Sequence, residues 1–199
     1  MTTFSLKYGT SSQTVELPSA RNLGVPRLRP PADAGQLVRE ALIAPLGSPP
    51  LRQRVQPGDQ VVIVTSDITR YTGSEIYLPI IVDELNRCGV ADPQISILIG
   101  LGIHRKQSET EHRKILGPLY GRIAVFDHDC DDPNQLVDLG QTSCGLPVQI
   151  NRRVVEADRV IVTGTIGIHY FAGFGGGRKG LVPGVASRET CMATHFRIF

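Results

Sequence analysis

Short, unbroken runs of apolar residues constrain the fold of this 199-residue chain more than any other feature. They lie at residues 61–64, 95–99, 123–126 and 160–162, and amphipathic segments separate them. Strands that are buried on both faces of a parallel sheet show this pattern, because helices cover both faces of such a sheet. The sequence therefore predicts an α/β fold with a doubly wound, mostly parallel sheet.

Two helices are predicted between the first three runs. Ser74 is placed to cap the first helix, and Ile76 would begin its apolar stripe. Ser108 and Glu111 have the spacing of a capping box, which predicts a second helix through about Leu116. The order is then β-α-β-α-β.

The N-terminal segment has a different pattern. Residues 4–7 and 13–17 alternate apolar and polar side chains around a turn at 9–11, which predicts a β-hairpin. Residues 20–31 are rich in Pro, Arg and Gly and predict an extended connector before a helix over 33–44.

The length is sufficient for a substantial core without disulfides or metals. We predict one α/β cofactor-binding domain over 1–199, with the hairpin and connector in 1–58 and the core and site loops in 59–199. The 41% hydrophobic and 20% charged residues are ordinary for a soluble protein.

Charge and cysteine content exclude several classes of protein. With 21 basic and 19 acidic residues the net charge is +2, so neither nucleic acid nor an anionic membrane surface is expected as a partner. The apolar runs are far shorter than the ~20 residues of a membrane span. The four cysteines lie far apart and form no C-x-x-C pair, so we expect reduced thiols in a cytoplasmic protein.

Ligands of doubly wound proteins bind beyond the carboxyl ends of the strands. Three loops in such positions carry reactive side chains: residues 66–73, 100–107 and 164–184. We therefore expect the functional site where these loops meet.

The first two loops offer an anion contact and a titratable ring. Asp67, Thr69 and Arg70 follow the first apolar run, and Arg70 could bind a carboxylate or phosphate. A loop ion pair with an Asx turn is the alternative. His104 follows the second run, where an imidazole suits acid–base work, although a lone histidine is often structural.

The third loop is the densest in unusual residues. Its glycines over 173–180 could bring backbone N–H groups close to a phosphate, and His169 precedes them. Gly180 follows Lys179 where a Walker A loop needs Ser or Thr. Lys179 beside Arg178 could have a lowered pKa and serve as a nucleophilic amine. A flexible tight turn is the alternative.

Three further features are less specific. His195 lies near the end of a short helix that Ser187 is predicted to cap, and alone it would be a surface histidine. The acidic segment 127–132 lacks the glycine and terminal Glu of an EF-hand, so we predict a solvated loop. His112 falls within a predicted helix without an evident partner, which indicates a structural role.

Taken together, these motifs resemble the N-terminal domain of lactate racemases that use a nickel-pincer nucleotide. The resemblance extends from about residue 60 to 195 and includes several separate motifs in order. They are Ser66-Asp67-Ile68-Thr69-Arg70, Gly102-Ile103-His104-Arg105, the stretch from His169 to Lys179, Pro183-Gly184-Val185-Ala186-Ser187 and Met192-Ala193-Thr194-His195.

The resemblance implies a role for each matching residue. Lys179 would hold the cofactor, a pyridinium bis-thiocarboxylate mononucleotide, through a thioamide bond, and His195 would be the protein ligand of nickel, a metal that imidazole suits. His104 and His169 would be the two acid–base residues. The remaining cofactor-binding residues would be Asp67, Thr69, Arg70, Gly176, Gly177 and Arg178, and Arg105 could meet the substrate carboxylate.

The function implied is racemisation or epimerisation of a small, lactate-like 2-hydroxy acid by hydride transfer to the lysine-bound nickel nucleotide. Its partners would be the proteins that build the cofactor and a separate C-terminal domain, because we expect this chain to lack the second domain of the family. Two alternatives stay open: a non-catalytic domain that binds the nickel nucleotide, and an unrelated phosphate-binding transferase domain.

Overall fold

The computed structural model describes residues 2–19, 32–169 and 173–196. The chain divides into two compact units, residues 1–32 and 33–199. The connector predicted over 20–31 lies outside the described residues. That the chain forms one domain stays a prediction.

The first unit contains the predicted hairpin. Strands β1 (Thr2–Tyr8) and β2 (Ser11–Leu17) pair in antiparallel register, with Phe4 opposite Val15. Gly9 takes a positive φ of 58° in the turn between them. The alternating pattern therefore predicted this element correctly.

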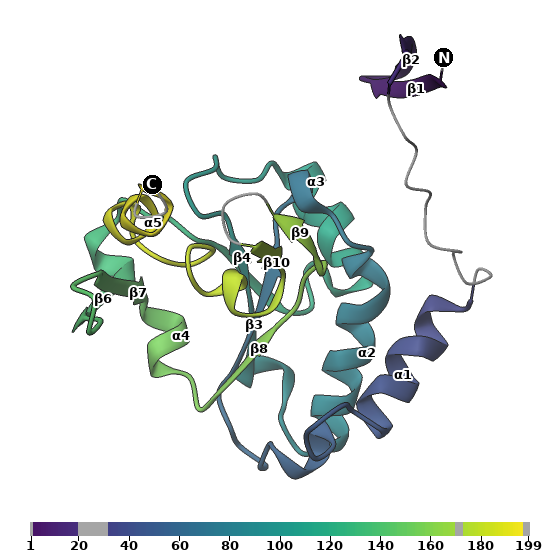
Figure 1. The fold of residues 1–199 in the computed structure, drawn as a ribbon. Helices are drawn as coiled ribbons and strands as arrows, with labels where there is room; N and C mark the ends of the chain where they lie inside the picture. The colour runs from purple at the N-terminus through teal and green to yellow at the C-terminus, as the bar shows by residue number, and fades with distance from the viewer. Residues whose placement is uncertain (1, 20–31, 170–172, 197–199) are drawn as a thin grey trace. The chain divides into compact units, whose positions relative to one another are not determined.

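A four-stranded parallel sheet forms the centre of the second unit (Figure 1). Its strands are β3 (Val61–Ser66), β4 (Ile95–Gly100), β5 (Ala124–Asp127) and β8 (Arg159–Val162), in the order β5-β4-β3-β8. Each predicted apolar run forms one of these strands. The chain moves outward from β3 to β5 and then returns to β8, so the order reverses beside β3, where an open α/β sheet forms its crevice.

Three helices lie on one side of the sheet in Figure 1, namely α1 (Ala34–Ile43), α2 (Ser74–Arg87) and α3 (Glu109–Leu116). Leu78 of α2 and Ile115 of α3 are fully buried in one core with Ile63 and Ile97 of the sheet. Alternate strand residues face this core because successive side chains of a strand point to opposite faces.

The other face is covered by α4 (Arg152–Glu156) and an antiparallel pair, β6 (Leu136–Gln141) and β7 (Pro147–Asn151). Here Val62, Val64 and Leu98 pack against Ile150 and the segment 185–186. Helices therefore flank both faces, as the doubly wound prediction required.

The predicted helix starts had different outcomes. The capping box is confirmed, because Ser108 N–H donates to Glu111 Oε2 (2.7 Å) and Glu111 N–H donates to Ser108 Oγ (3.3 Å). The prediction that Ser74 caps α2 is wrong. Gly73 holds the capping position with a φ of 76°, and Ser74 is the first residue of the helix, with its side chain buried. Ile76 is 42% exposed and does not belong to the core.

The C-terminal part contains a small hairpin and one more helix. Strands β9 (Gly167–His169) and β10 (Gly173–Gly175) pair in antiparallel register, and a 3-10 turn follows at Gly177–Gly180. Helix α5 spans Arg188–Phe196, and Thr190 N–H donates to Ser187 Oγ (3.1 Å), which confirms Ser187 as its cap. Further 3-10 turns lie at Leu51–Gln53, Ile68–Arg70, Asp92–Gln94, Gly117–Leu119 and Pro133–Gln135.

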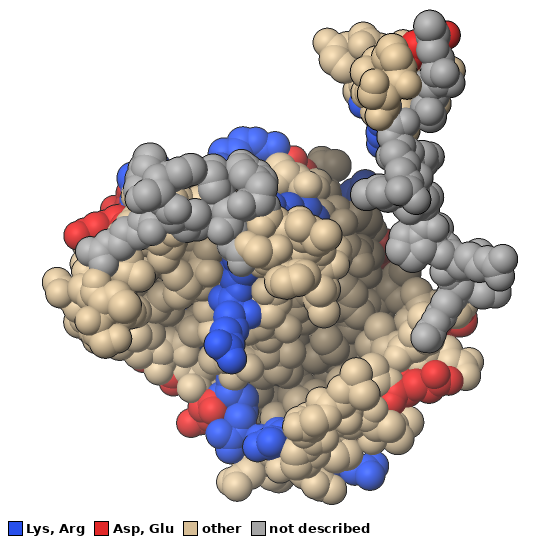
Figure 2. Space-filling view, in the orientation of Figure 1, with Lys and Arg blue, Asp and Glu red and all other residues tan. Residues whose placement is uncertain are grey.

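On the face drawn in Figure 2, basic side chains lie in a row down the middle of the larger unit, and acidic side chains lie in small separate groups. Within the part of the chain that the structure describes, no helix combines the length and apolar character needed to cross a membrane.

The prediction that residues 127–132 form a solvated loop is wrong for 127–130. His128 is 1% exposed and Cys130 is 7% exposed. The His128 ring donates from Nε2 to the Ala186 carbonyl (2.9 Å) and accepts at Nδ1 from the Asn151 amide (3.1 Å). Contacts with distant residues satisfy both ring nitrogens, which composition alone could not reveal.

Burial of His128 makes stability depend on pH. Burial lowers the pKa of His128, although the hydrogen bond to Ala186 and the charge of Asp129 partly oppose this effect. The unfolded chain then binds more protons than the folded chain, since an unperturbed histidine titrates near ~6.5. The stability contribution is complete above that pH and is lost as the pH falls through the lower, folded-state pKa.

We therefore expect a lower melting temperature at pH 5.5 than at pH 7.5, with a smaller difference in a His128→Gln variant. Thermal unfolding followed by circular dichroism at both pH values measures this. An identical pH dependence in the two proteins would contradict it.

Candidate functional site

A cavity of about 690 Å³ opens at the carboxyl ends of β3, β4 and β8. All three loops chosen from the sequence contribute to it, and α5 closes one side. Its position is the one expected where the strand order reverses beside β3.

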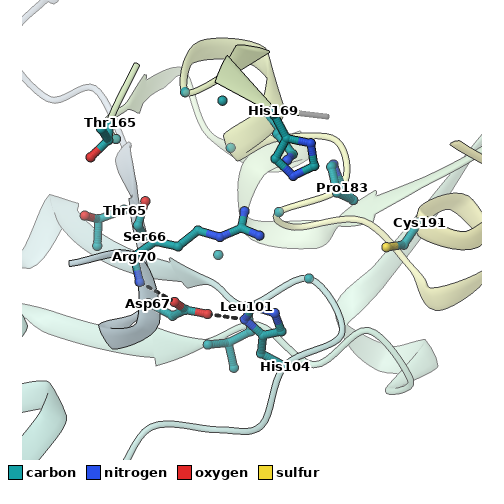
Figure 3. Close-up of a pocket in the computed structure, with 18 of the residues that line it drawn as sticks. Thr65, Ser66, Asp67, Arg70, Leu101, His104, Thr165, His169, Pro183 and Cys191 are labelled. Atoms are coloured by element: carbon teal, nitrogen blue, oxygen red, sulfur yellow. Dashed lines mark hydrogen bonds and ion pairs between the residues drawn. The ribbon is translucent and has the colours of Figure 1, made fainter. Parts of the chain in front are cut away.

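Asp67 organises the loop after β3. Its carboxylate is 2% exposed and accepts hydrogen bonds from Thr69 Oγ1 (2.6 Å) and Arg70 N–H (3.2 Å). These bonds cap the 3-10 turn Ile68–Arg70. Asp67 thus acts as the cap of this turn, with a bond one residue longer than in the Asx turn considered from the sequence. The Arg70 side chain extends from this turn into the cavity (Figure 3).

The loop after β4 brings His104 to the same carboxylate. His104 Nδ1 lies 2.5 Å from Asp67 Oδ2, and 41% of the His104 side chain stays exposed. A carboxylate that accepts from Nδ1 fixes the ring and its tautomer and leaves Nε2 as the basic atom. His104 is thus arranged as an oriented acid–base group that small molecules can reach.

The glycine-rich loop supports a buried amine. Gly176 has a φ of 78°, and a Cβ on it would lie 2.7 Å from the Thr165 carbonyl oxygen, so only glycine allows this close approach. Lys179 follows, and its Nζ is buried with no hydrogen-bond partner among the described residues. Burial, and then the charge of Arg70, lowers the pKa of Lys179. This raises the fraction of neutral, nucleophilic amine.

Two further histidines reach the cavity. His169 is the last residue of β9 and lies across the cavity from His104 in Figure 3. His195 comes from α5, and its Nδ1 donates to the Cys191 carbonyl (2.8 Å), so its neutral ring carries the lone pair on Nε2. A ring oriented by such a backbone contact is a typical metal ligand.

We expect His169 to be neutral at pH 7. Desolvation lowers its pKa, and the charges of Lys179, Arg70 and His195 lower it further. The ring should therefore titrate below ~6.5 in an NMR titration, and Lys179→Met should raise the pKa. Lys106→Met, which removes a lysine paired with Asp129 (3.1 Å), is the control and should leave it unchanged. Titration above the unperturbed value would contradict this assignment.

The structure separates the predicted site residues into two groups. Asp67, Arg70, His104, His169, Gly176, Lys179 and His195 line the cavity. Thr69 contacts Asp67 instead, and Gly177 and Arg178 do not line it. Arg178 lies at a second depression, which Phe174 also lines. The Arg105 guanidinium makes two 2.8 Å hydrogen bonds to Glu111.

Cys191 was not predicted as a site residue from the sequence. It lies four residues before His195 on α5, is 3% exposed and lines the cavity. Burial raises the pKa of its thiol, so the Cys191 side chain is a neutral, polarisable part of the cavity surface. Its spacing of four residues from His195, which places both on one face of a helix, was the one signal in the sequence that could have identified it. Among the described residues, no group of three or more His, Cys, Asp or Glu side chains is placed to hold a metal ion.

Comparison with known proteins agrees with this arrangement. The model of the lactate racemase N-terminal domain matches residues 8–199. A lactate racemase from Thermoanaerobacterium thermosaccharolyticum is 32% identical over 98% of this chain and 47% of its own. A lactate racemase from Lactiplantibacillus plantarum is 36% identical over 80% of this chain and 38% of its own. The chain thus spans about half the length, or less, of these relatives.

Solved structures give the same result. The lactate racemase apoprotein from Thermoanaerobacterium thermosaccharolyticum superposes with a TM-score of 0.82 and 33% identity, covering 96% of this chain and 45% of that one. A Thermotoga maritima protein shares the fold, with a TM-score of 0.67 and 23% identity over 82% of this chain and 41% of its own. With a family model matched over nearly its whole length, this chain belongs to the lactate racemase family, in the region of the N-terminal domain.

Proposed function

We propose that this chain is the cofactor-bearing part of a racemase or epimerase acting on a small, lactate-like 2-hydroxy acid. The buried, unpartnered Nζ of Lys179 carries the proposal. A lysine in a cavity without a hydrogen-bond partner costs free energy, and a covalent bond at this nitrogen removes the charge that is costly to bury.

The residues present fit a nickel-pincer nucleotide. Lys179 would hold it covalently, Arg70 would contact its phosphate, and Gly176 allows the backbone to approach it closely. His195 would bind nickel through Nε2, and one protein ligand is sufficient when the organic pincer supplies the others. When bound, the group supplies hydride-transfer chemistry at the substrate carbon.

His104 and His169 would manage the proton of the substrate hydroxyl. They come from different loops and line the same cavity, as a racemase requires if each enantiomer is to meet a base. Asp67 orients His104, and the lowered pKa of His169 keeps that ring able to accept a proton.

The second candidate function is binding of the nickel nucleotide without turnover. The Lys179 amine and the His195 ring would hold the nucleotide and its metal whether or not a substrate is bound, which supports this candidate. A separately produced second half of a relative distinguishes the two, because only a split racemase would gain activity when it is added. The substrate and the cytoplasmic location belong to the proposal, and the thiols of Cys88, Cys130 and Cys191 agree with that location.

Intact mass and nickel content test the proposal after co-expression with the proteins that build the cofactor. We expect a mass increase on Lys179 and about one nickel per chain. A His195→Ala control should keep the added mass and lose most of the nickel. An unmodified wild-type chain without nickel would contradict cofactor binding by this part of the protein.

A further inference from the structure

Asp127, the last residue of β5, and His128, the residue after it, point to opposite faces of the sheet. Val125 packs toward the core beneath α2 and α3, and Phe126 packs toward the opposite core. The alternation continues, so Asp127 faces α3 and His128 faces the segment before α5. Asp127 and His128 together therefore make contacts on both faces of the sheet, at the carboxyl end of β5.

Asp127 holds the loop that carries His104. Its Oδ2 accepts from Gln107 N–H (2.7 Å), and its Oδ1 lies 2.8 Å from His112 Nε2. The side chains of Asp127 and His112 are 10% and 20% exposed, so this bond is largely shielded from water. His112 therefore has a partner that sequence analysis did not identify.

Gln107 extends this connection to the neighbouring loop. Its Oε1 accepts from Ile68 N–H (3.0 Å), at the start of the 3-10 turn that carries Arg70. The carboxylate of Asp127 is thereby linked, through one glutamine, to the loops of both His104 and Arg70. We call residues 67–70 and 101–107 the His104 wall of the cavity.

His128 holds the opposite wall. Its Nε2 donates to Ala186 O, and Ala186 also forms a bridge with Ile150 of β7. Ser187, the next residue, caps α5, and Arg188 N–H donates to Cys130 O (3.1 Å). We call α5, which presents Cys191 and His195 to the cavity, the α5 wall.

We propose that Asp127 and His128 are positioning residues that fix the two walls of the cavity independently, Asp127 the His104 wall and His128 the α5 wall. Neither residue lines the cavity, so neither is a catalytic residue. That each residue fixes one wall follows from the contacts above alone. What the two walls contribute to catalysis rests on the proposed function.

Hydrogen–deuterium exchange of the full, cofactor-free chain tests the inference. Asp127→Ala should accelerate amide exchange in residues 67–70 and 101–107 by about tenfold, as expected for loss of one buried hydrogen bond, and leave 188–195 unchanged. His128→Leu should do the reverse. A role in global stability alone would accelerate exchange in both walls together.

Conservative variants provide the matched controls. Asp127→Asn keeps an acceptor for Gln107, and His128→Gln keeps a donor that can reach Ala186, so both should restore protection. If Asp127→Ala or His128→Leu does not fold, two milder variants replace them. Gln107→Ala should accelerate amide exchange only in 67–70 and 101–107. His128→Asn, whose side chain is too short to reach Ala186, should accelerate it only in 188–195. Equal acceleration in both walls, or none in either, overturns the inference. Because no cofactor is involved, this result is separate from the failure or success of nickel loading.

Discussion

Replacing Lys179 with alanine should abolish the proposed covalent attachment of the nickel nucleotide, so that the intact mass after co-expression equals that of the bare chain. The physical reason is that the other described lysines lie outside the cavity, whereas the Lys179 amine is buried in it with a lowered pKa. A lowered pKa increases the fraction of the neutral amine, which is the form that acts as a nucleophile. Mass spectrometry of the purified protein, with peptide mapping, measures the outcome.

Two variants serve as controls for this prediction. Lys179→Arg keeps a positive charge but has no amine that forms the bond, so it should also stay unmodified. Lys106→Ala removes an exposed lysine outside the cavity and should load as the wild type does. A Lys179→Ala protein that still carries the added mass would refute the assignment of the attachment site.

Replacing Gly184 with alanine destabilises the fold by about 3 kcal/mol, the upper part of the range for overpacking. A Cβ at this position would lie 2.8 Å from the Gly180 carbonyl carbon and closer still to its oxygen. Gly184 also bonds through its backbone, donating to Lys179 O (3.1 Å) and accepting from Gly102 N–H (2.8 Å). The clash therefore disturbs both the loop that carries Lys179 and the His104 wall.

Thermal unfolding measures this effect. For a chain of this size about 3 kcal/mol corresponds to a fall of roughly 6–12 °C in melting temperature. Gly167→Ala is the matched control, because a Cβ there meets nothing within 4 Å. Equal melting temperatures for the two variants would show that the backbone around Gly180 can move without cost.

The sheet and several helix starts were predictable because their causes are local. Continuous apolar runs report burial on both faces, and the residues at Ser108 and Glu111 satisfy each other within one turn. The hairpins β6–β7 and β9–β10 were not predicted, since β6 is partly exposed and β9–β10 is rich in glycine, which weakens any alternating pattern.

Most of the predicted residues line the cavity, whereas the lining by Cys191 and the contacts between the residues were not predictable. The positions of Asp67, His104 and Lys179 after strands pointed to one edge of the sheet. The pairing of Asp67 with His104 joins residues from two loops, and the burial of His128 depends on Ala186 and Asn151. Such partners are set by tertiary packing, on which local sequence carries no information.

The strand order has a consequence for synthesis of the protein. Strand β8 is made after β3, β4 and β5 but inserts beside β3, through pairs such as Val61 with Arg159. A chain emerging from the ribosome can therefore form the edge that holds Asp67 and His104 before the segment with Lys179 exists. Lys179, the proposed attachment residue, would therefore join an edge of the sheet that has already formed.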